Sequence, residues 1–262
     1  MKVNHIYNWD CIEILKNEIT SWSISLIFAD PPYNLSWKDM KLVWNKTGWD
    51  WQKVNEKWDT MSEEDYFEFT NEWIKSSYLA LKEWGSIYIS STYHNLWEVL
   101  MNLKTNWFKI QNIITWYKSN SMPNITKRSF THACEYIVWA TKWKWWTFNY
   151  EVSKEINPEK QKDWTEKQMR DMWILPLCQW QERIKAEDNK SLHPTQKPEE
   201  LLKRIILIWS NEWDIVLDPF NGSGTTTYMA KLLSRQYIWI EKEGKYYNAS
   251  LERMEKLNGG LF

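Results

Sequence analysis

Glycine is scarce in this chain. The 262 residues include only 7 glycines, whereas ordinary usage of about 7% would give roughly 18. Tryptophan is correspondingly abundant, with 22 residues. Trp9, Trp84 and Trp213 stand at strand ends or among polar residues, where turn chemistry favours glycine. The pattern predicts that the source organism reads UGA as glycine, so that such positions are glycine in the native protein; the alternative is a genuinely tryptophan-rich chain.

Cysteine is also sparse. Cys11, Cys134 and Cys178 lie far apart without a Cys-x-x-Cys pair, and the histidines are scattered. Neither a disulfide framework nor a metal site is therefore indicated. No apolar run reaches the roughly 20 residues that span a membrane, and the N-terminus shows no signal-peptide pattern. We expect a soluble, cytoplasmic protein with no membrane partner.

The chain has no large excess of charge of either sign, since 33 basic and 34 acidic residues give a net charge of −1. This balance provides no global signal for a nucleic-acid partner. The local distribution differs: residues 101–150 hold seven basic side chains and one acid, Glu135, so that 7 − 1 = +6. A basic segment within a neutral chain favours contact with phosphates on one face.

The first informative motif is Asp30-Pro31-Pro32-Tyr33. It follows the apolar run from Ile24 to Ala29, which predicts a buried strand. The motif therefore places a carboxylate, two prolines with free carbonyls and an aromatic ring at the end of a strand. Asp30 and a backbone carbonyl can accept the two N–H bonds of a planar amine while Tyr33 stacks on its face.

The second motif runs from Asp218 to Thr226 and reads Asp-Pro-Phe-Asn-Gly-Ser-Gly-Thr-Thr. It follows the short predicted strand 215–217 and opens a helix. Gly222 and Gly224 allow the backbone to approach a ligand where a Cβ atom would clash. The motif therefore predicts a ligand-binding loop.

Two further acids, Asp10 and Glu241, also follow predicted strands. Ligands of open α/β sheets lie at the carboxyl ends of strands. Together with Asp30 and Asp218, these acids fit a site for an adenosine ligand. Glu241 can bind the ribose hydroxyls of such a ligand, and Asp10 is expected near another part of it.

Strands alternate with helices along the chain, which favours an α/β fold with a doubly wound, mostly parallel sheet. The expected strands are 3–7, 24–29, 86–90, 108–116, 135–140, 215–217 and 237–240. The expected helices are 11–17, one capped by Ser62, 95–103, 198–208, one through 229–233, and 246–257. Residues 118–190 are polar with weak periodicity and are expected to form an insert outside the sheet.

A third motif, His193-Pro194-Thr195-Gln196-Lys197-Pro198, precedes the Asp218 motif by some twenty residues. With Asp30-Pro31-Pro32-Tyr33 earlier in the chain, this order resembles the β-class DNA amino-methyltransferases over nearly the whole sequence. The resemblance implies a Rossmann-like methyltransferase fold that uses S-adenosylmethionine. It also implies a permuted sheet, in which the unit ending at Glu241 precedes the first strand in space and both termini lie close together.

The resemblance further implies the roles of individual residues. A flipped adenine would stack on Tyr33, with its N6 amine bonded to Asp30 and the Pro31 carbonyl. The acidic first residue of the motif resembles the N6-adenine branch rather than the N4-cytosine branch. The implied catalytic residues are Asp30, Pro31, Pro32 and Tyr33. The implied cofactor-binding residues are Asp10, His193, Thr195, Lys197, Asp218, Phe220, Gly222, Ser223, Gly224, Thr225 and Glu241.

Residues 1–117 and 191–262 are then expected to form the catalytic and cofactor-binding domain, and residues 118–190 a target-recognition insert. Residues 112–132 look most like the adenine methylases of DpnII-type GATC restriction systems, in particular the member that acts on single strands. The implied partners are double-stranded DNA and single strands, with a homodimer and a cognate restriction endonuclease left open. The implied DNA-binding residues are Lys118, Asn120, Asn124, Lys127, Arg128 and His132.

Two other hypotheses stay open at this point. Methylation of cytosine N4 or of RNA would use the same fold. A catalytically idle DNA-binding relative is the rival from another class, and the intact Asp30 and glycine motifs argue against it. The methylated nucleoside separates the first pair, and binding of S-adenosylmethionine separates the second.

The hypothesis that some tryptophans replace glycine can be checked in the structure. Left-handed backbones or exposed rings are expected at Trp9, Trp84, Trp213 and Trp239, whereas a large apolar side chain is natural at other positions. The family resemblance adds further positions where relatives carry small residues, namely Trp22, Trp97, Trp107, Trp180 and Trp209. The positions expected to hold true tryptophan are Trp58, Trp73, Trp116, Trp139 and Trp173, of which Trp73, Trp116 and Trp139 should be buried at negative φ.

Overall fold

The computed structural model describes residues 1–34, 61–124, 127–179, 182–185, 192–193 and 195–259. Its strands form one sheet in the order β1-β8-β7-β2-β3-β5-β4-β6. The strands are β1 (His5–Tyr7), β2 (Ile24–Ala29), β3 (Leu81–Ser91), β4 (Lys109–Lys118), β5 (Cys134–Thr141), β6 (Met172–Leu175), β7 (Ile215–Asp218) and β8 (Gln236–Ile240). The helices are α1 (Cys11–Asn17), α2 (Glu63–Ala80), α3 (Leu96–Thr105), α4 (Tyr150–Glu155), α5 (Glu199–Trp209), α6 (Thr225–Leu232) and α7 (Gly244–Gly259).

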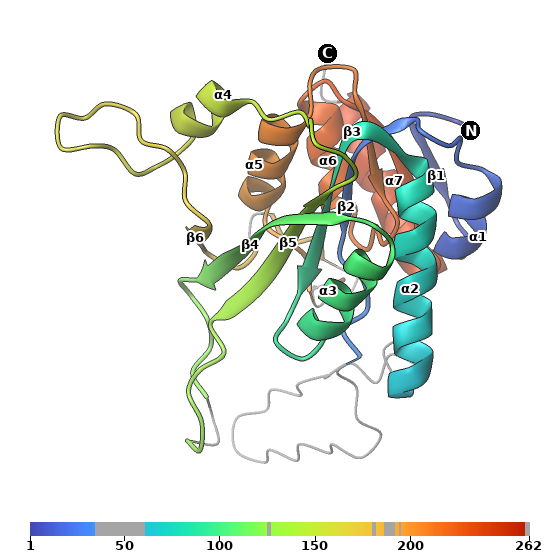
Figure 1. Ribbon diagram of the computed structural model, residues 1–262, viewed down its shortest axis with the longest axis horizontal. Helices are drawn as coiled ribbons and strands as arrows, with labels where there is room; N and C mark the ends of the chain where they lie inside the picture. Colours follow the sequence, from blue (N-terminus) through green and yellow to red (C-terminus); the bar gives the residue numbers. More distant parts are fainter. Residues whose placement is uncertain (35–60, 125–126, 180–181, 186–191, 194, 260–262) are drawn as a thin grey trace.

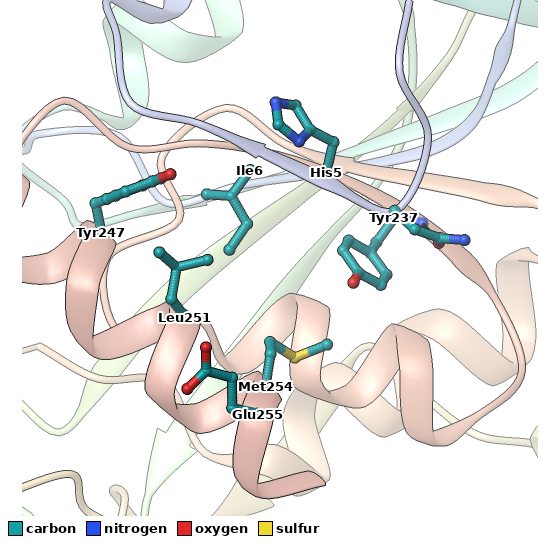
Figure 2. A pocket seen from close by; sticks show the side chains of 8 residues that line it. His5, Ile6, Tyr237, Tyr247, Leu251, Met254 and Glu255 are labelled. Carbon is teal, nitrogen blue, oxygen red and sulfur yellow. Dashed lines mark hydrogen bonds between the residues drawn. The ribbon is translucent and has the colours of Figure 1, made fainter. Parts of the chain in front are cut away.

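The first strand of the chain lies beside the last one. β1 pairs with β8 in parallel, with Tyr7 opposite Ile240, and Met254 of α7 packs against Ile6. The predicted permutation is therefore confirmed, although the closeness of the termini depends on residues 260–262, which lie outside the described residues. Figure 2 shows a pocket between β1 and α7, near the start of β1 and so away from its carboxyl end.

Helices cover both faces of the sheet, as the doubly wound prediction requires (Figure 1). Ile27 of β2 packs with α1, α2 and α3 on one face, and its neighbours Leu26 and Phe28 pack with α5 and α6 on the other. β2 is consequently buried along its whole length, which explains its continuous apolar run. α2 begins where the sequence predicts, because the hydroxyl of Ser62 accepts the Asp65 N–H at 3.1 Å.

The strand β5 runs antiparallel to both of its neighbours, β3 and β4. The prediction that residues 118–190 lie outside the sheet is therefore wrong, because β5 and β6 belong to it. β6 has only four residues, too few for a periodic signal. Since β5 ends at the opposite edge, residues 142–171 with α4 leave the sheet far from residues 119–133, which follow β4 (Figure 1). Within the described part of residues 118–190, only the segment 119–133 and the residues after β6 leave at the carboxyl edge of the parallel strands.

Among the described residues, four tryptophans have a left-handed backbone: Trp22, Trp107, Trp164 and Trp213, with φ of 62°, 61°, 65° and 70°. All four rings are exposed. A Cβ atom in this conformation costs about 1–2 kcal/mol, which glycine avoids. The rings of Trp9, Trp84 and Trp97 are also exposed, and Trp84 lies in an irregular part of β3 between Leu81 and Ser86 rather than before the strand.

The expectation is wrong for Trp239, which is only 1% exposed and packs against Ile6 and Met254. Trp209, where the resemblance alone favoured a small residue, is also buried. Trp58 and Trp180 lie outside the described residues. The tryptophans expected to be natural are buried and have no left-handed backbone, namely Trp73, Trp116, Trp139 and Trp173.

Replacing Trp107 or Trp213 by glycine should raise the free energy of unfolding by about 1 kcal/mol each, because the left-handed strain is relieved. The control Trp116→Gly should lower it by about 3 kcal/mol or more, since it empties a core position. Urea denaturation measures both effects. Destabilisation by the first two changes would contradict the strain argument. TGG codons at Trp107 and Trp213 in the gene would end the UGA hypothesis.

Candidate active site

Four acids lie at the carboxyl ends of four consecutive neighbours in the sheet. Asp10, Glu241, Asp218 and Asp30 belong to the ends of β1, β8, β7 and β2, in that spatial order. All three pairings between these strands are parallel, so the four ends meet at one edge. The row of acids expected from the sequence is therefore contiguous in space.

Glu241 is tied to the glycine loop. Its Oε2 accepts the N–H of Gly222 at 2.7 Å, and its Oε1 accepts the N–H of Glu243 at 2.7 Å. Burial raises the pKa of Glu241 to about 7 in spite of these bonds. Each carboxylate oxygen accepts more than one hydrogen bond, so the pair of oxygens can still bind two neighbouring hydroxyls.

The glycines of the loop are required by conformation and by space. Gly222 and Gly224 have φ of +53° and +76°, and a Cβ atom on Gly222 would lie 3.0 Å from Nε2 of His193. On Gly224 it would lie 3.0 Å from Oγ of Ser250. The His193 ring, whose Nδ1 lies 3.4 Å from the Thr195 N–H, therefore brings the third motif against the second.

Asp218 is buried behind this loop. Its Oδ1 accepts the N–H of Phe220 at 2.9 Å. Burial raises the pKa of Asp218 to about 7, and the charges of Asp30 and Glu241 act in the same direction. The Phe220 ring packs against Trp73, with ring centroids 5.3 Å apart, and so anchors the loop to the core.

Both oxygens of Asp30 are held by other side chains. Its Oδ1 accepts the Tyr33 hydroxyl at 2.8 Å, and its Oδ2 accepts Nζ of Lys197 at 2.6 Å. The Tyr33 hydroxyl also lies 2.7 Å from Oγ of Ser90. Burial raises the pKa of Tyr33 well above its usual value, and Asp30 and Glu135 add to this. Tyr33 therefore stays protonated, and its hydroxyl donates a hydrogen bond to the Asp30 carboxylate.

Lys197 lies at Asp30 rather than directly at the glycine loop. Its Nζ is 3.8 Å from Oε2 of Glu135 and 5.4 Å from the centre of the Tyr33 ring. Burial lowers the pKa of Lys197, but the charges of Asp30, Glu135 and Asp218 outweigh burial and raise it. This lysine is consequently a cation enclosed by carboxylates.

Sequence reasoning missed two residues of this cluster, Glu135 and Ser90. Glu135 is the single acid in the basic segment 101–150, and that isolation was a usable signal. Ser90 lies near the carboxyl end of β3, the strand beside β2, where the rule about strand ends would have found it.

The other predicted cofactor residues lie near the same edge in varied roles. Asp10 caps α1, with Oδ1 accepting the Ile12 N–H at 3.0 Å, and pairs with Lys242 at 3.1 Å. Arg253 of α7 donates to the Ser223 carbonyl and to the Thr225 hydroxyl. The expectation of a free carbonyl is wrong for Pro32, because this carbonyl accepts the Tyr66 hydroxyl at 2.8 Å and so fixes the turn after β2.

The predicted DNA contacts differ in exposure. Lys127, Arg128 and His132 are exposed on the segment 119–133, whereas Lys118 is paired with Glu135 at 3.2 Å. Asn120 accepts the Leu177 N–H, and Asn124 bonds Ser129. His132 stacks with Tyr93 at 5.0 Å between ring centroids.

Within the described residues, no group of three or more His, Cys, Asp or Glu side chains could hold a metal ion. No helix in this part of the chain is long and apolar enough to cross a membrane.

The site has counterparts in known sequences. The family described as DNA methylase matches residues 24–252. The chain is 40% identical over 258 residues to type II methyltransferase M.HinfI of Haemophilus influenzae, an alignment that covers 97% of this chain and 69% of that protein. It is 41% identical over 258 residues to type II methyltransferase M2.MboI of Moraxella bovis, covering 97% and 88% of the two chains.

Solved structures show the same architecture. The M1.HpyAVI–SAM complex matches with a TM-score of 0.66 and 28% identity, covering 95% of this chain and 98% of that chain. The PvuII DNA methyltransferase, described as cytosine-N4-specific, matches with a TM-score of 0.69 and 20% identity, covering 97% and 89%. At that identity the second likeness shows the fold alone.

Asp218→Asn should flatten the pH dependence of stability. The pKa of Asp218 is about 7 in the folded protein and 3.8 in the unfolded chain. Between pH 3.8 and about 7 the folded state therefore holds a proton that the unfolded state has lost. The free energy of unfolding therefore falls as pH rises through this window, and less so in the variant. Urea titrations at several pH values measure this. The exposed control Asp163→Asn should follow the wild type, because hydrogen bonds from Thr165 lower the pKa of Asp163. Parallel curves for wild type and Asp218→Asn would contradict the assignment.

Proposed function

Because this chain belongs to the DNA methylase family, we propose that it is a type II DNA methyltransferase that methylates the N6 amine of adenine with S-adenosylmethionine. The observation that carries the proposal is the position of Asp30 directly after β2, the strand that pairs with β7, which leads into the glycine loop. An amine acceptor and a cofactor loop on neighbouring strands are what a direct transfer between two bound molecules requires.

The residues of the loop fit the cofactor. S-adenosylmethionine supplies a methyl group made electrophilic by a sulfonium cation. The paired oxygens of Glu241 suit the ribose hydroxyls, and Gly222, which has no Cβ atom, lets the loop lie directly against the His193 ring. Asp218 and Asp30 add negative charge beside the loop, which favours a cation. The M1.HpyAVI complex with SAM supports the same cofactor here.

Asp30 holds the target amine in this proposal. An ionised carboxylate accepts an N–H of the amine and stabilises the positive charge that develops on its nitrogen. It also orients the amine toward the methyl donor, and such positioning supplies much of the rate. Tyr33 provides an aromatic face for the flipped base. The acid at position 30 supports adenine as the target base, following the resemblance to the N6 branch.

DNA is proposed to lie along the edge from which residues 119–133 project. Lys127 and Arg128 are exposed there, and Tyr93 and His132 offer stacked rings beside them. We assign target recognition to this segment instead of the whole range 118–190. Single strands as a second substrate, a homodimer and a cognate endonuclease stay predictions; the type II relatives support the last.

Asp30→Asn should reduce methyl transfer by about 10²-fold or more, because the amine loses its anionic acceptor. Binding of S-adenosylmethionine should stay close to that of the wild type. Transfer of labelled methyl groups to unmethylated DNA measures the first quantity and calorimetry the second. The matched control is Asp163→Asn on the opposite edge. Wild-type turnover in Asp30→Asn would refute the proposed role.

Replacing Lys127 and Arg128 together by alanine should weaken DNA binding for all sequences alike. The slope of log K against log salt should become shallower by about 0.9 for each phosphate that the variant no longer neutralises. Fluorescence anisotropy at several salt concentrations gives this slope. The control pair Lys160 and Lys162, also exposed, lies on the segment that leaves the opposite edge. An altered site preference at an unchanged slope would instead assign the two residues to base readout.

A further inference from the structure

We propose that Lys197 is a positioning residue for methyl transfer, which fixes the Asp30 carboxylate so that Oδ1 faces the target amine, and that Glu135 anchors Lys197. This inference rests on the proposed function and goes beyond it. Its basis is an alternating row of charges in the order Asp30, Lys197, Glu135 and Lys118, joined by distances of 2.6, 3.8 and 3.2 Å.

The row is assembled from separate parts of the chain. Asp30 follows β2, Lys197 precedes α5, Glu135 lies on β5 and Lys118 ends β4. Strand register brings the last two together, because Glu135 is opposite Trp116 and Lys118, two residues further on, projects from the same side. Lys197 is only 6% exposed, so its charge depends on these carboxylates.

The hydrogen bonds decide which oxygen of Asp30 is released to a substrate. If Oδ2 were given to the substrate, the buried Lys197 ammonium would keep the Thr195 carbonyl oxygen at 3.5 Å and Oε2 of Glu135 at 3.8 Å as its acceptors, and a buried charge paired so poorly is costly. Giving Oδ1 to the substrate costs less, because the Tyr33 hydroxyl that Oδ1 now binds keeps its contact with Oγ of Ser90 at 2.7 Å. The target amine therefore takes the place of the Tyr33 hydroxyl at Oδ1 while Lys197 keeps Oδ2.

Glu135 anchors Lys197 by its charge. The four charges of the row sum to zero, with the anion Asp30 at the end that faces the target amine and the cation Lys118, 3.2 Å from Oε1 of Glu135, at the other end. The Oε2 atom of Glu135, the one nearest Lys197, is buried and has no hydrogen-bond partner among the described residues, so its interaction with Lys197 is electrostatic.

The test measures methyl transfer at saturating S-adenosylmethionine, with cofactor affinity determined separately by calorimetry. Lys197→Met should lower kcat by about 10²-fold through misplacement of Asp30, with unchanged cofactor affinity. The acid limb of the kcat–pH profile should move to higher pH, since a carboxylate without its cation is protonated more readily. Lys197→Arg should restore part of kcat.

A second variant covers the case in which Lys197→Met fails to fold. Glu135→Gln keeps the side-chain shape and should lower kcat at unchanged cofactor affinity, and this loss should vanish when Lys197 is already methionine. Loss of cofactor affinity with normal kcat at saturation would overturn the inference and return Lys197 to the cofactor site. Unchanged kcat and pH profile in both variants would also overturn it. Wild-type protein that binds DNA but transfers no methyl group would instead refute the proposed function.

Discussion

The parallel pairing of β2 with β7, of β7 with β8 and of β8 with β1 is the constraint on which the site depends. Parallel strands bring their carboxyl ends to one edge of the sheet. The register decides which residues lie level with one another there: Ile27 lies opposite Leu217, so Asp218 and Asp30 come soon after this pair on adjacent strands. The N–H of Glu241 donates to the Tyr7 carbonyl at 2.9 Å and aligns the next two strand ends. Helices on both faces bury these strands, so that only the loops at the strand ends can contact a ligand.

Burial gives this edge its electrostatic character. Asp218 and Glu241 have pKa values raised to about 7 by desolvation, so the ligand-free site holds carboxyl groups that ionise reluctantly. A cationic ligand relieves this cost, because it replaces lost water by an opposite charge. Lys197 already does so for Asp30. The same low-polarity surroundings that make the acids costly for the fold make them effective toward a sulfonium and a developing ammonium.

Most of the correct predictions came from local sequence patterns, whereas contacts between residues far apart in the chain could not be predicted. The end of β2 and the glycine loop were predictable, because an apolar run and a turn residue are local features. Lys197 was assigned to the cofactor, since its contact with Asp30 joins residues 167 apart in sequence. The strand β6 is too short for periodicity to register. Trp213 was recognised as misplaced from its polar neighbours, whereas Trp239 was misjudged because β8 buries it between Ile6 and Met254.

The most direct test of the account is the identity of the methylated base. DNA from a host without its own methylation, carrying this gene with glycine codons at the left-handed tryptophan positions, is digested to nucleosides and analysed by mass spectrometry. The account predicts N6-methyladenine, formed only when Asp30 is intact. N4-methylcytosine as the sole product, or no methylated base from a protein that binds both S-adenosylmethionine and DNA, would contradict it.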